Sequence, residues 1–239
     1  MTYGLVKGKS LLPFKLISPV RKYFFFLFVA FLFAGSASAQ RLKLGLLVYN
    51  GGGDWYANPT SLKNLALFCN ANLKTNLDPI EGQVSIASPE LFNYPFLHMT
   101  GHGRWDVSPA EAQNLRAYLE GGGFLHIDDN FGLDVYVRPT LKKVFPELTL
   151  VELPFSHPVY HQKFNFPAGL PKVHEHDKGA AKGYGLIYKG RLVVFYSFDT
   201  DLGDGWEDPE VHNDTPEQRA KALQMGCNLL QYAFTAGGS

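Results

Sequence analysis

The sequence has few cysteines and lacks the short motifs that would identify a reaction. Only 2 Cys occur in 239 residues, which excludes a small disulfide-rich protein. The dinucleotide fingerprint G-x-G-x-x-G and the nucleophile elbow G-x-S-x-G are both missing. Function therefore has to be inferred from the predicted fold and from the positions of the polar residues in it.

The distribution of charge excludes one class of partner. The chain carries 22 Lys and Arg against 22 Asp and Glu, but residues 1–39 hold five basic residues and no acidic one. The rest of the chain therefore has a net charge of about −5, and no basic cluster follows residue 41. Nucleic-acid binding needs clustered Lys and Arg to attract phosphates, so we expect no nucleic-acid partner.

Residues 1–39 have the pattern of a secretory signal peptide. Arg21 and Lys22 precede the apolar run of residues 23–35, and Ala37-Ser38-Ala39 supplies the small residues that a signal peptidase recognises. The run is shorter than the roughly 20 residues of a membrane span. We predict cleavage after Ala39 and a single periplasmic or secreted domain over residues 40–239. An uncleaved membrane anchor at residues 23–35 is the alternative.

Beyond residue 40, patterns typical of strands and helices alternate. Short apolar runs predict buried strands, amphipathic stretches predict helices, and residues 186–196 predict a late hairpin. Two helix starts are well marked, by Ser108-Pro109-Ala110-Glu111 and by Thr215-Pro216-Glu217-Gln218. The expected strands are residues 42–49, 84–87, 96–100, 124–128 and 148–153, and the expected helices are residues 59–73, 108–120, 135–144 and 215–234. This order predicts an α/β fold with a mostly parallel sheet, covered on both faces, and a late antiparallel hairpin at one edge.

Polar residues follow several of the predicted strands. In an open α/β sheet, ligands bind beyond the carboxyl ends of the strands, so these residues are expected to share one edge. The candidates for ligand binding are Asp54, Trp55, His102, Arg104, Asp129 and Asn130, and the candidates for catalysis are His102, Asp128, Asp129 and His157. Asp199 and Asp201, after the hairpin, are expected at the same edge.

The candidates also have structural interpretations. Gly51–Gly53 could serve a turn, Trp55 could pack in the core instead of stacking on a sugar, and His102 could make a local hydrogen bond. We expect Asp128 and Asp129 to avoid burial, because an unpaired buried carboxylate is costly. They point to opposite faces of a strand, so at most one can face a given ligand; capping of the next helix is the alternative.

No metal site and no cofactor are expected. His157 and His161 would lie about 13 Å apart in an extended chain, too far for one metal ion. The loop sequence His174-Glu175-His176 has no second pair of ligands at metal-binding spacing. Residues 154–185, which are rich in Pro, Gly and His, either form a lid over the cleft or cover an edge of the sheet.

The two cysteines fall on the apolar faces of the first and last long helices. Cys69 and Cys227 are therefore expected to be small buried residues. If those helices are neighbours, the pair could form a disulfide in an oxidising compartment.

Four stretches also occur in a characteristic order: Gly52–Tyr56, Tyr94–Gly103, Leu115–Leu119 with Gly121–Asp129, and Ser156–His161. Together they resemble the bacterial DUF4159 domain family over nearly all of residues 41–235. The resemblance implies the flavodoxin-like three-layer sandwich of class I glutamine amidotransferase-like domains. Active amidotransferases have a Cys where this chain has Asp128-Asp129-Asn130, so glutaminase chemistry is not expected. Relatives that occur beside MoxR-type ATPases and von Willebrand A-type proteins imply an envelope protein as a partner.

Two functions from different classes are compatible with these patterns. The first is a non-catalytic cell-envelope module that binds a polar ligand, such as a carbohydrate, or a partner protein. The second is a hydrolase in which His102 or His157 is the acid–base residue, a carboxylate is its partner or the nucleophile, and Arg104 binds an anion. Convergence of His102 with one of Asp128 and Asp129 and with His157 or Asp54 in a pocket would favour the hydrolase.

Overall fold

The computed structural model describes residues 1–4, 41–129, 131–174 and 179–236. Arg41–Ser239 forms one unit of the chain and is described here by itself. The expected signal peptide, with its apolar run at residues 23–35, lies outside the described residues apart from its first four, and so does Asn130. Among the described residues, we find no helix that combines the length and the hydropathy of a membrane span.

Seven strands of the described residues form one sheet, in the order β2-β1-β3-β4-β7-β6-β5. The parallel strands are β1 (Gly45–Val48), β2 (Gly82–Ser85), β3 (Phe96–Met99), β4 (Phe124–Asp128) and β7 (Arg191–Phe198), and the antiparallel additions are β5 (Val151–Glu152) and β6 (Lys182–Tyr188). The β6–β7 hairpin turns at Lys189 and Gly190, both with positive φ (49° and 81°), as a two-residue type I′ turn requires. The predicted parallel sheet with a late antiparallel hairpin is confirmed. The strand expected at residues 148–153 is shorter, because only Val151–Glu152 pairs with β6.

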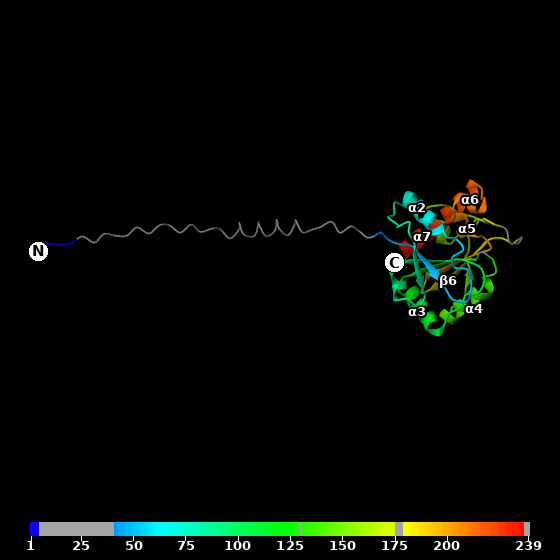
Figure 1. Ribbon diagram of the computed structural model, residues 1–239, viewed down its shortest axis with the longest axis horizontal. Helices are drawn as coiled ribbons and strands as arrows, with labels where there is room; N and C mark the ends of the chain where they lie inside the picture. Colours follow the sequence, from blue (N-terminus) through cyan, green and yellow to red (C-terminus); the bar gives the residue numbers. More distant parts are fainter. Residues whose placement is uncertain (5–40, 130, 175–178, 237–239) are drawn as a thin grey trace. The chain divides into compact units, whose positions relative to one another are not determined.

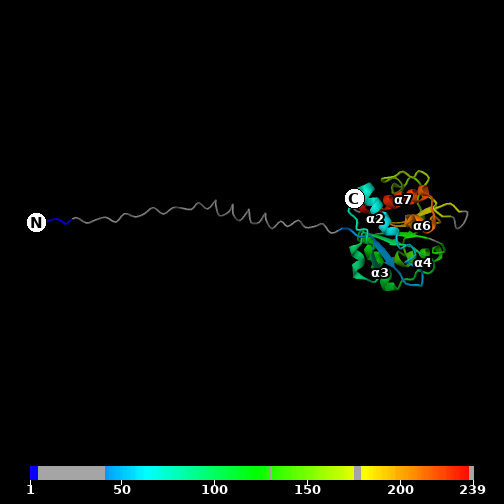
Figure 2. The same cartoon turned by 45° about the horizontal axis from the view of Figure 1, so that its top comes forward.

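Helices cover both faces of the sheet and make three layers (Figures 1 and 2). One apolar core contains side chains from α2 (Ser61–Leu73), α5 (Leu202–Trp206) and α7 (Pro216–Thr235), and the other contains side chains from α3 (Pro109–Glu120) and α4 (Asp134–Val144). The remaining short elements are η1 (Pro89–Asn93), η2 (Pro158–Tyr160) and α6 (Pro209–His212). Strand order β2-β1-β3-β4-β7 is the flavodoxin-like order of five parallel strands.

The short helix α5 is held against the sheet by its last residue, Trp206. The indole is fully buried, donates its N–H to the Ala222 carbonyl at 2.8 Å, and lies about 5 Å from the rings of His98 and His126 in β3 and β4. Gly226 of α7 makes room for it, because a Cβ there would lie 2.7 Å from the indole Cζ2. This packing fixes α5 beyond the end of β7.

The two cysteines are buried free thiols on α2 and α7, as expected. The two helices pack together, and a hydrogen bond with Cys227 raises the pKa of Cys69, with burial adding to the rise. The condition for a disulfide, that the two helices are neighbours, is therefore met. The disulfide itself stays a prediction, which counting of free thiols in the unreduced protein would test.

Candidate functional site at the carboxyl edge of the sheet

The loops that follow β1, β3 and β4 are joined to one another at the carboxyl edge. Asp54 N donates to the His102 carbonyl and Gly53 N donates to the Arg104 carbonyl, both at 3.2 Å. His102 in turn forms a bridge with Phe131, just after β4. The expectation that distant turns meet along one edge is confirmed for these three loops.

Asp54 and His102 form an exposed polar pair on this edge. One carboxylate oxygen of Asp54 accepts from the His102 backbone N–H, and the other lies 3.0 Å from His102 Nδ1. The side chains are 36% and 50% exposed, respectively. Burial opposes ionisation of Asp54, but the hydrogen bonds from the backbone and ring of His102 prevail and lower its pKa. The neighbouring Gly101 has φ +125°, and a Cβ there would lie 2.7 Å from the Asp54 carbonyl, so this close approach of the loops requires glycine.

Two aromatic side chains follow Asp54. Trp55 is partly buried and packs against both apolar cores, which matches the structural interpretation of this residue. Tyr56 is 63% exposed, and its ring lies edge-on to Trp55 with 5.4 Å between the ring centroids. Tyr56, which sequence reasoning passed over, is therefore an exposed aromatic ring two residues after Asp54 in the same loop.

The expectation that Asp128 and Asp129 avoid burial is wrong. Asp128 is fully buried and Asp129 is 4% exposed, because distant parts of the chain supply hydrogen bonds to both. Asp128 accepts from Ser197 Oγ and from the backbone N–H groups of Leu202 (3.3 Å) and Gly203 (2.6 Å). Burial, reinforced by the charge of Asp201, still raises the pKa of Asp128 to about 8.

Asp129 holds the segment that leads into α4 and does not cap the helix, whose N-cap residue is Leu133. It accepts from the backbone N–H of Leu133, before α4, at 2.9 Å and from the Tyr196 hydroxyl at 2.8 Å. Burial raises its pKa. Both carboxylates thus hold backbone segments at the edge.

A chain of buried hydrogen bonds runs from Asp128 into the sheet. Ser197 Oγ lies 2.8 Å from His126 Nε2, and His126 Nδ1 lies 3.0 Å from His98 Nδ1. Among the described residues, His98 Nε2 has no hydrogen-bond partner. The tautomers that leave no buried N–H unpaired have His98 donating to His126, His126 donating to Ser197 and Ser197 donating to Asp128. Burial lowers the pKa of His98 to about 3 and that of His126 well below its usual range.

Two other predicted site residues do not join the Asp54–His102 pair. Arg104 is exposed and its guanidinium pairs with Asp106 at 2.8 Å, so it is not aimed at a shared anion site with His102. His157 caps η2 and its ring lies 5.7 Å from that of Tyr232, which lies 6.3 Å from the ring of Phe124 at the amino end of β4. His157 is therefore at the opposite edge of the sheet from His102.

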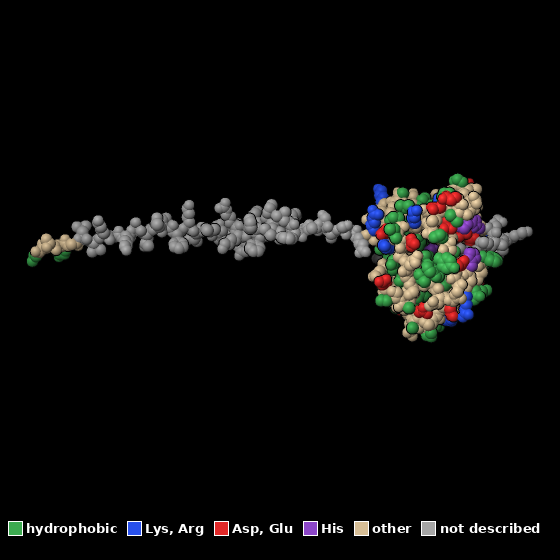
Figure 3. Space-filling model, in the orientation of Figure 1, with side chains coloured by type: hydrophobic (Ala, Val, Ile, Leu, Met, Phe, Trp, Pro, Cys, Tyr) green, Lys and Arg blue, Asp and Glu red, His purple; other side chains and the backbone are tan. Residues whose placement is uncertain are grey.

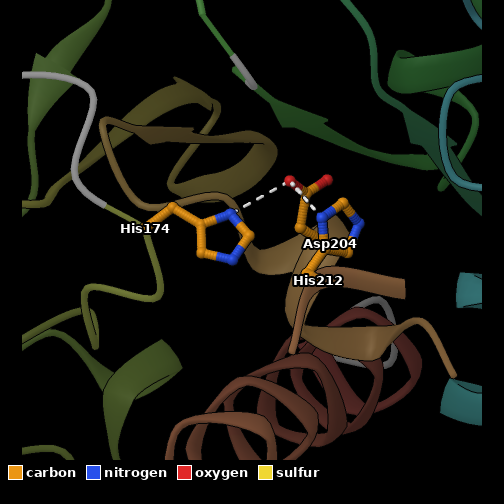
Figure 4. A group of neighbouring side chains, drawn as sticks. All are labelled: His174, Asp204 and His212. Carbon is orange, nitrogen blue, oxygen red and sulfur yellow. Dashed lines mark hydrogen bonds and ion pairs between the residues drawn. The ribbon is translucent and has the colours of Figure 1, made fainter. Parts of the chain in front are cut away.

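A second polar cluster lies at the carboxyl edge and was missed by sequence reasoning. His174 Nδ1 lies 3.1 Å from Asp204 Oδ2 and 3.5 Å from Asp201 Oδ2, while His174 Nε2 lies 2.9 Å from Asp214 Oδ1. His212 of α6 lies on the other side of Asp204 (Figure 4). Hydrogen bonds with Asp201 and Asp204 raise the pKa of His174 to about 10. The space-filling view shows histidine and acidic side chains gathered near α5 and α6 (Figure 3).

Asn58 connects the two parts of the edge. Its Oδ1 accepts from Thr100 Oγ1 at 2.6 Å, directly before the Gly101-His102 turn, and its Nδ2 donates to Asp204 Oδ1 at 2.5 Å. Asn58 is only 5% exposed. No sequence pattern marks it, since its partners lie 42 and 146 residues away.

The doubly covered sheet, with loops that meet at its carboxyl edge, defines a flavodoxin-like α/β domain. The chain belongs to the DUF4159 family, a domain of unknown function whose family model matches residues 43–234. This confirms the family resemblance given by the four sequence stretches. No curated protein matches the chain.

Proposed function

We propose that this domain is an exported cell-envelope module that binds a polar, hydroxyl-rich ligand of the carbohydrate class at the carboxyl edge of its sheet. The observation that carries the proposal is the exposed Asp54–His102 pair, which backbone hydrogen bonds hold between two loops. The exposed ring of Tyr56 lies on the same loop. Carbohydrates suit such a surface, because an aromatic face takes the apolar side of a sugar ring while charged groups bond its hydroxyls.

The location of the protein is part of the proposal. The signal-peptide pattern of residues 1–39 supports release of residues 40–239 into the periplasm or the medium after Ala39, with an anchor at residues 23–35 as the alternative. In the amidotransferase-like interpretation, the absence of a Cys at Asp128-Asp129 supports a domain without the glutaminase nucleophile. The two cysteines are buried on α2 and α7, away from the loops of the edge. An envelope protein of the MoxR or von Willebrand A-type systems is the other candidate partner.

Binding is tested by calorimetry with soluble N-acetylglucosamine oligomers and muropeptides as probes. We expect saturable binding that Tyr56→Ala and Asp54→Asn each weaken about tenfold or more, equivalent to 1.4 kcal/mol. The matched control is Phe92→Ala, which removes an aromatic ring of similar exposure (52%) on η1. Binding that survives both edge substitutions would place the ligand elsewhere, and no binding of any probe would reject the carbohydrate class.

One observation favours a hydrolase as the second candidate function. Asp54 Oδ2 is within hydrogen-bonding distance of His102 Nδ1, which orients the ring and leaves Nε2 to exchange a proton with a substrate. His102→Gln is then expected to abolish release of new reducing ends from the same probes while leaving their binding measurable. If this variant turned over the probes at the wild-type rate, or if the wild-type protein showed no turnover, the hydrolase function would be rejected and binding would remain the proposed function.

A further inference from the structure

The second cluster at the carboxyl edge has the composition of a metal centre. His174 comes from the segment between η2 and β6, Asp204 from α5 and His212 from α6, and one ligand-capable atom of each lies within 4.8 Å of the others. Figure 4 shows the Asp204 carboxylate between the two imidazole rings, with one oxygen facing a nitrogen of each. The three side chains are 23%, 11% and 27% exposed, respectively, so the cluster is shielded but open to solvent.

The spacing of these atoms is close to that of ligands around one ion. Ligands about 2.0–2.1 Å from a tetrahedral zinc ion lie about 3.3 Å from one another. Asp204 Oδ2 lies 3.1 Å from His174 Nδ1 and 3.7 Å from His212 Nδ1. The ligand atoms of His174 and His212 lie within 4.8 Å of each other, so the two rings have to move closer together around a bound ion.

The outer hydrogen bonds are those that metal-binding histidines make. The nitrogen of each ring that points away from Asp204 is bonded to a carboxylate: His174 Nε2 to Asp214 Oδ1 at 2.9 Å, and His212 Nε2 to Glu207 Oε2 at 2.8 Å. Such a carboxylate fixes the ring tautomer and makes the other nitrogen a better ligand. Asp204 is oriented in the same way, because Asn58 donates to its second oxygen.

Within the described part of the chain, the two rings differ in their contacts with Asp204. A protonated His174 can donate to Asp204 and Asp214 together. His212 Nδ1, however, lies 3.7 Å from Asp204, beyond hydrogen-bonding distance. A shared cation would give both rings the same role and would offset the negative charge of the surrounding carboxylates.

We infer that His174, Asp204 and His212 bind a divalent transition-metal ion, for which Zn²⁺ is the best-fitting choice. Two imidazoles and one carboxylate suit Zn²⁺ better than Ca²⁺ or Mg²⁺, which prefer oxygen ligands. Three protein ligands leave one position of a tetrahedral ion for water or another small ligand. The inference does not rest on the carbohydrate-binding function, since it uses none of Asp54, Tyr56 and His102.

The test is metal binding by the purified full chain after treatment with EDTA. We expect one Zn²⁺ per chain by calorimetry and elemental analysis, and a visible absorption band when Co²⁺ is added instead. His212→Gln is expected to weaken Zn²⁺ binding by about 100-fold or more, and the outer substitution Glu207→Gln by about 10- to 100-fold. His161→Gln, which changes a histidine outside the cluster, should leave it unchanged.

Two results would overturn the inference. One is that the wild-type protein binds no Zn²⁺, or that a His174→Gln, His212→Gln double variant with a wild-type circular dichroism spectrum binds Zn²⁺ as tightly as the wild type does. The other is an X-ray absorption spectrum of the zinc-loaded wild-type protein that shows fewer than two imidazole ligands. The second measurement needs no variant, so it decides the matter even where the double variant fails to fold.

Discussion

Asparagine in place of Asp128 is expected to make the protein progressively more stable than the wild type as the pH rises from about 4 to about 8. Burial raises the pKa of Asp128 from its ordinary value of 3.8 to about 8. Over this window the unfolded chain ionises Asp128 while the folded chain keeps it protonated, so the wild type loses about 1.4 kcal/mol of stability from this group per pH unit. Asparagine does not titrate, and its side-chain oxygen can still accept from Gly203 N.

This expectation is checked by urea unfolding of both proteins between pH 4.5 and pH 8.5, with EDTA present so that bound metal does not contribute. Glu217→Gln, which removes a 78% exposed carboxylate, is the control and should follow the wild-type pH dependence. If the stability difference between the wild type and Asp128→Asn stayed constant over this range, Asp128 would be ionised in the folded protein.

The buried histidine pair is expected to have the opposite pH dependence. The pKa of His98 is lowered by burial from 6.5 to about 3, so below pH 6.5 the unfolded chain takes up a proton that the folded chain does not. Stability that is fully present above pH 6.5 is therefore lost as the pH falls toward 3. His98→Leu should thus gain about 2 kcal/mol relative to the wild type between pH 7 and pH 5. Leucine also removes the hydrogen bond between His98 and His126, but that loss is the same at every pH and leaves the pH dependence as the measure of His98 protonation.

Unfolding curves at pH 7, 6 and 5 measure this effect. His161→Gln changes an exposed histidine and serves as the control, which should keep the wild-type sensitivity to acid. If the free energies of unfolding of the wild type and His98→Leu changed in parallel with pH, His98 would take up its proton in the folded protein as readily as in the unfolded chain. Because Asp128 and His98 belong to one hydrogen-bonded chain, the two variants together test the protonation states at its two ends.

Features set by local sequence were predictable. Ser108 accepts from Glu111 N while Glu111 accepts from Ser108 N, so the capping-box pattern gave the start of α3 correctly. The same holds for Thr215 and Gln218 at α7. The glycines around His102 also indicated a tight loop, and the loop does approach Asp54 closely.

Features that depend on distant partners were not predictable. Asp128 looked too costly to bury because its donors, Ser197, Leu202 and Gly203, lie 69 to 75 residues away. His174 and Asp204 are 30 residues apart and meet only because α5 packs beyond β7. The neighbouring residues of the loop sequence, Glu175 and His176, lie outside the described residues.

The single amide of Asn58 has a consequence for both parts of the edge. Its oxygen accepts from Thr100 beside the Asp54–His102 loop, and its nitrogen donates to Asp204. A rigid planar group cannot shift at one end without shifting at the other. If occupancy of one part changes affinity at the other through Asn58, thermodynamic reciprocity requires an equal factor in both directions, so zinc titrations with and without saturating sugar would report the same coupling as sugar titrations with and without zinc.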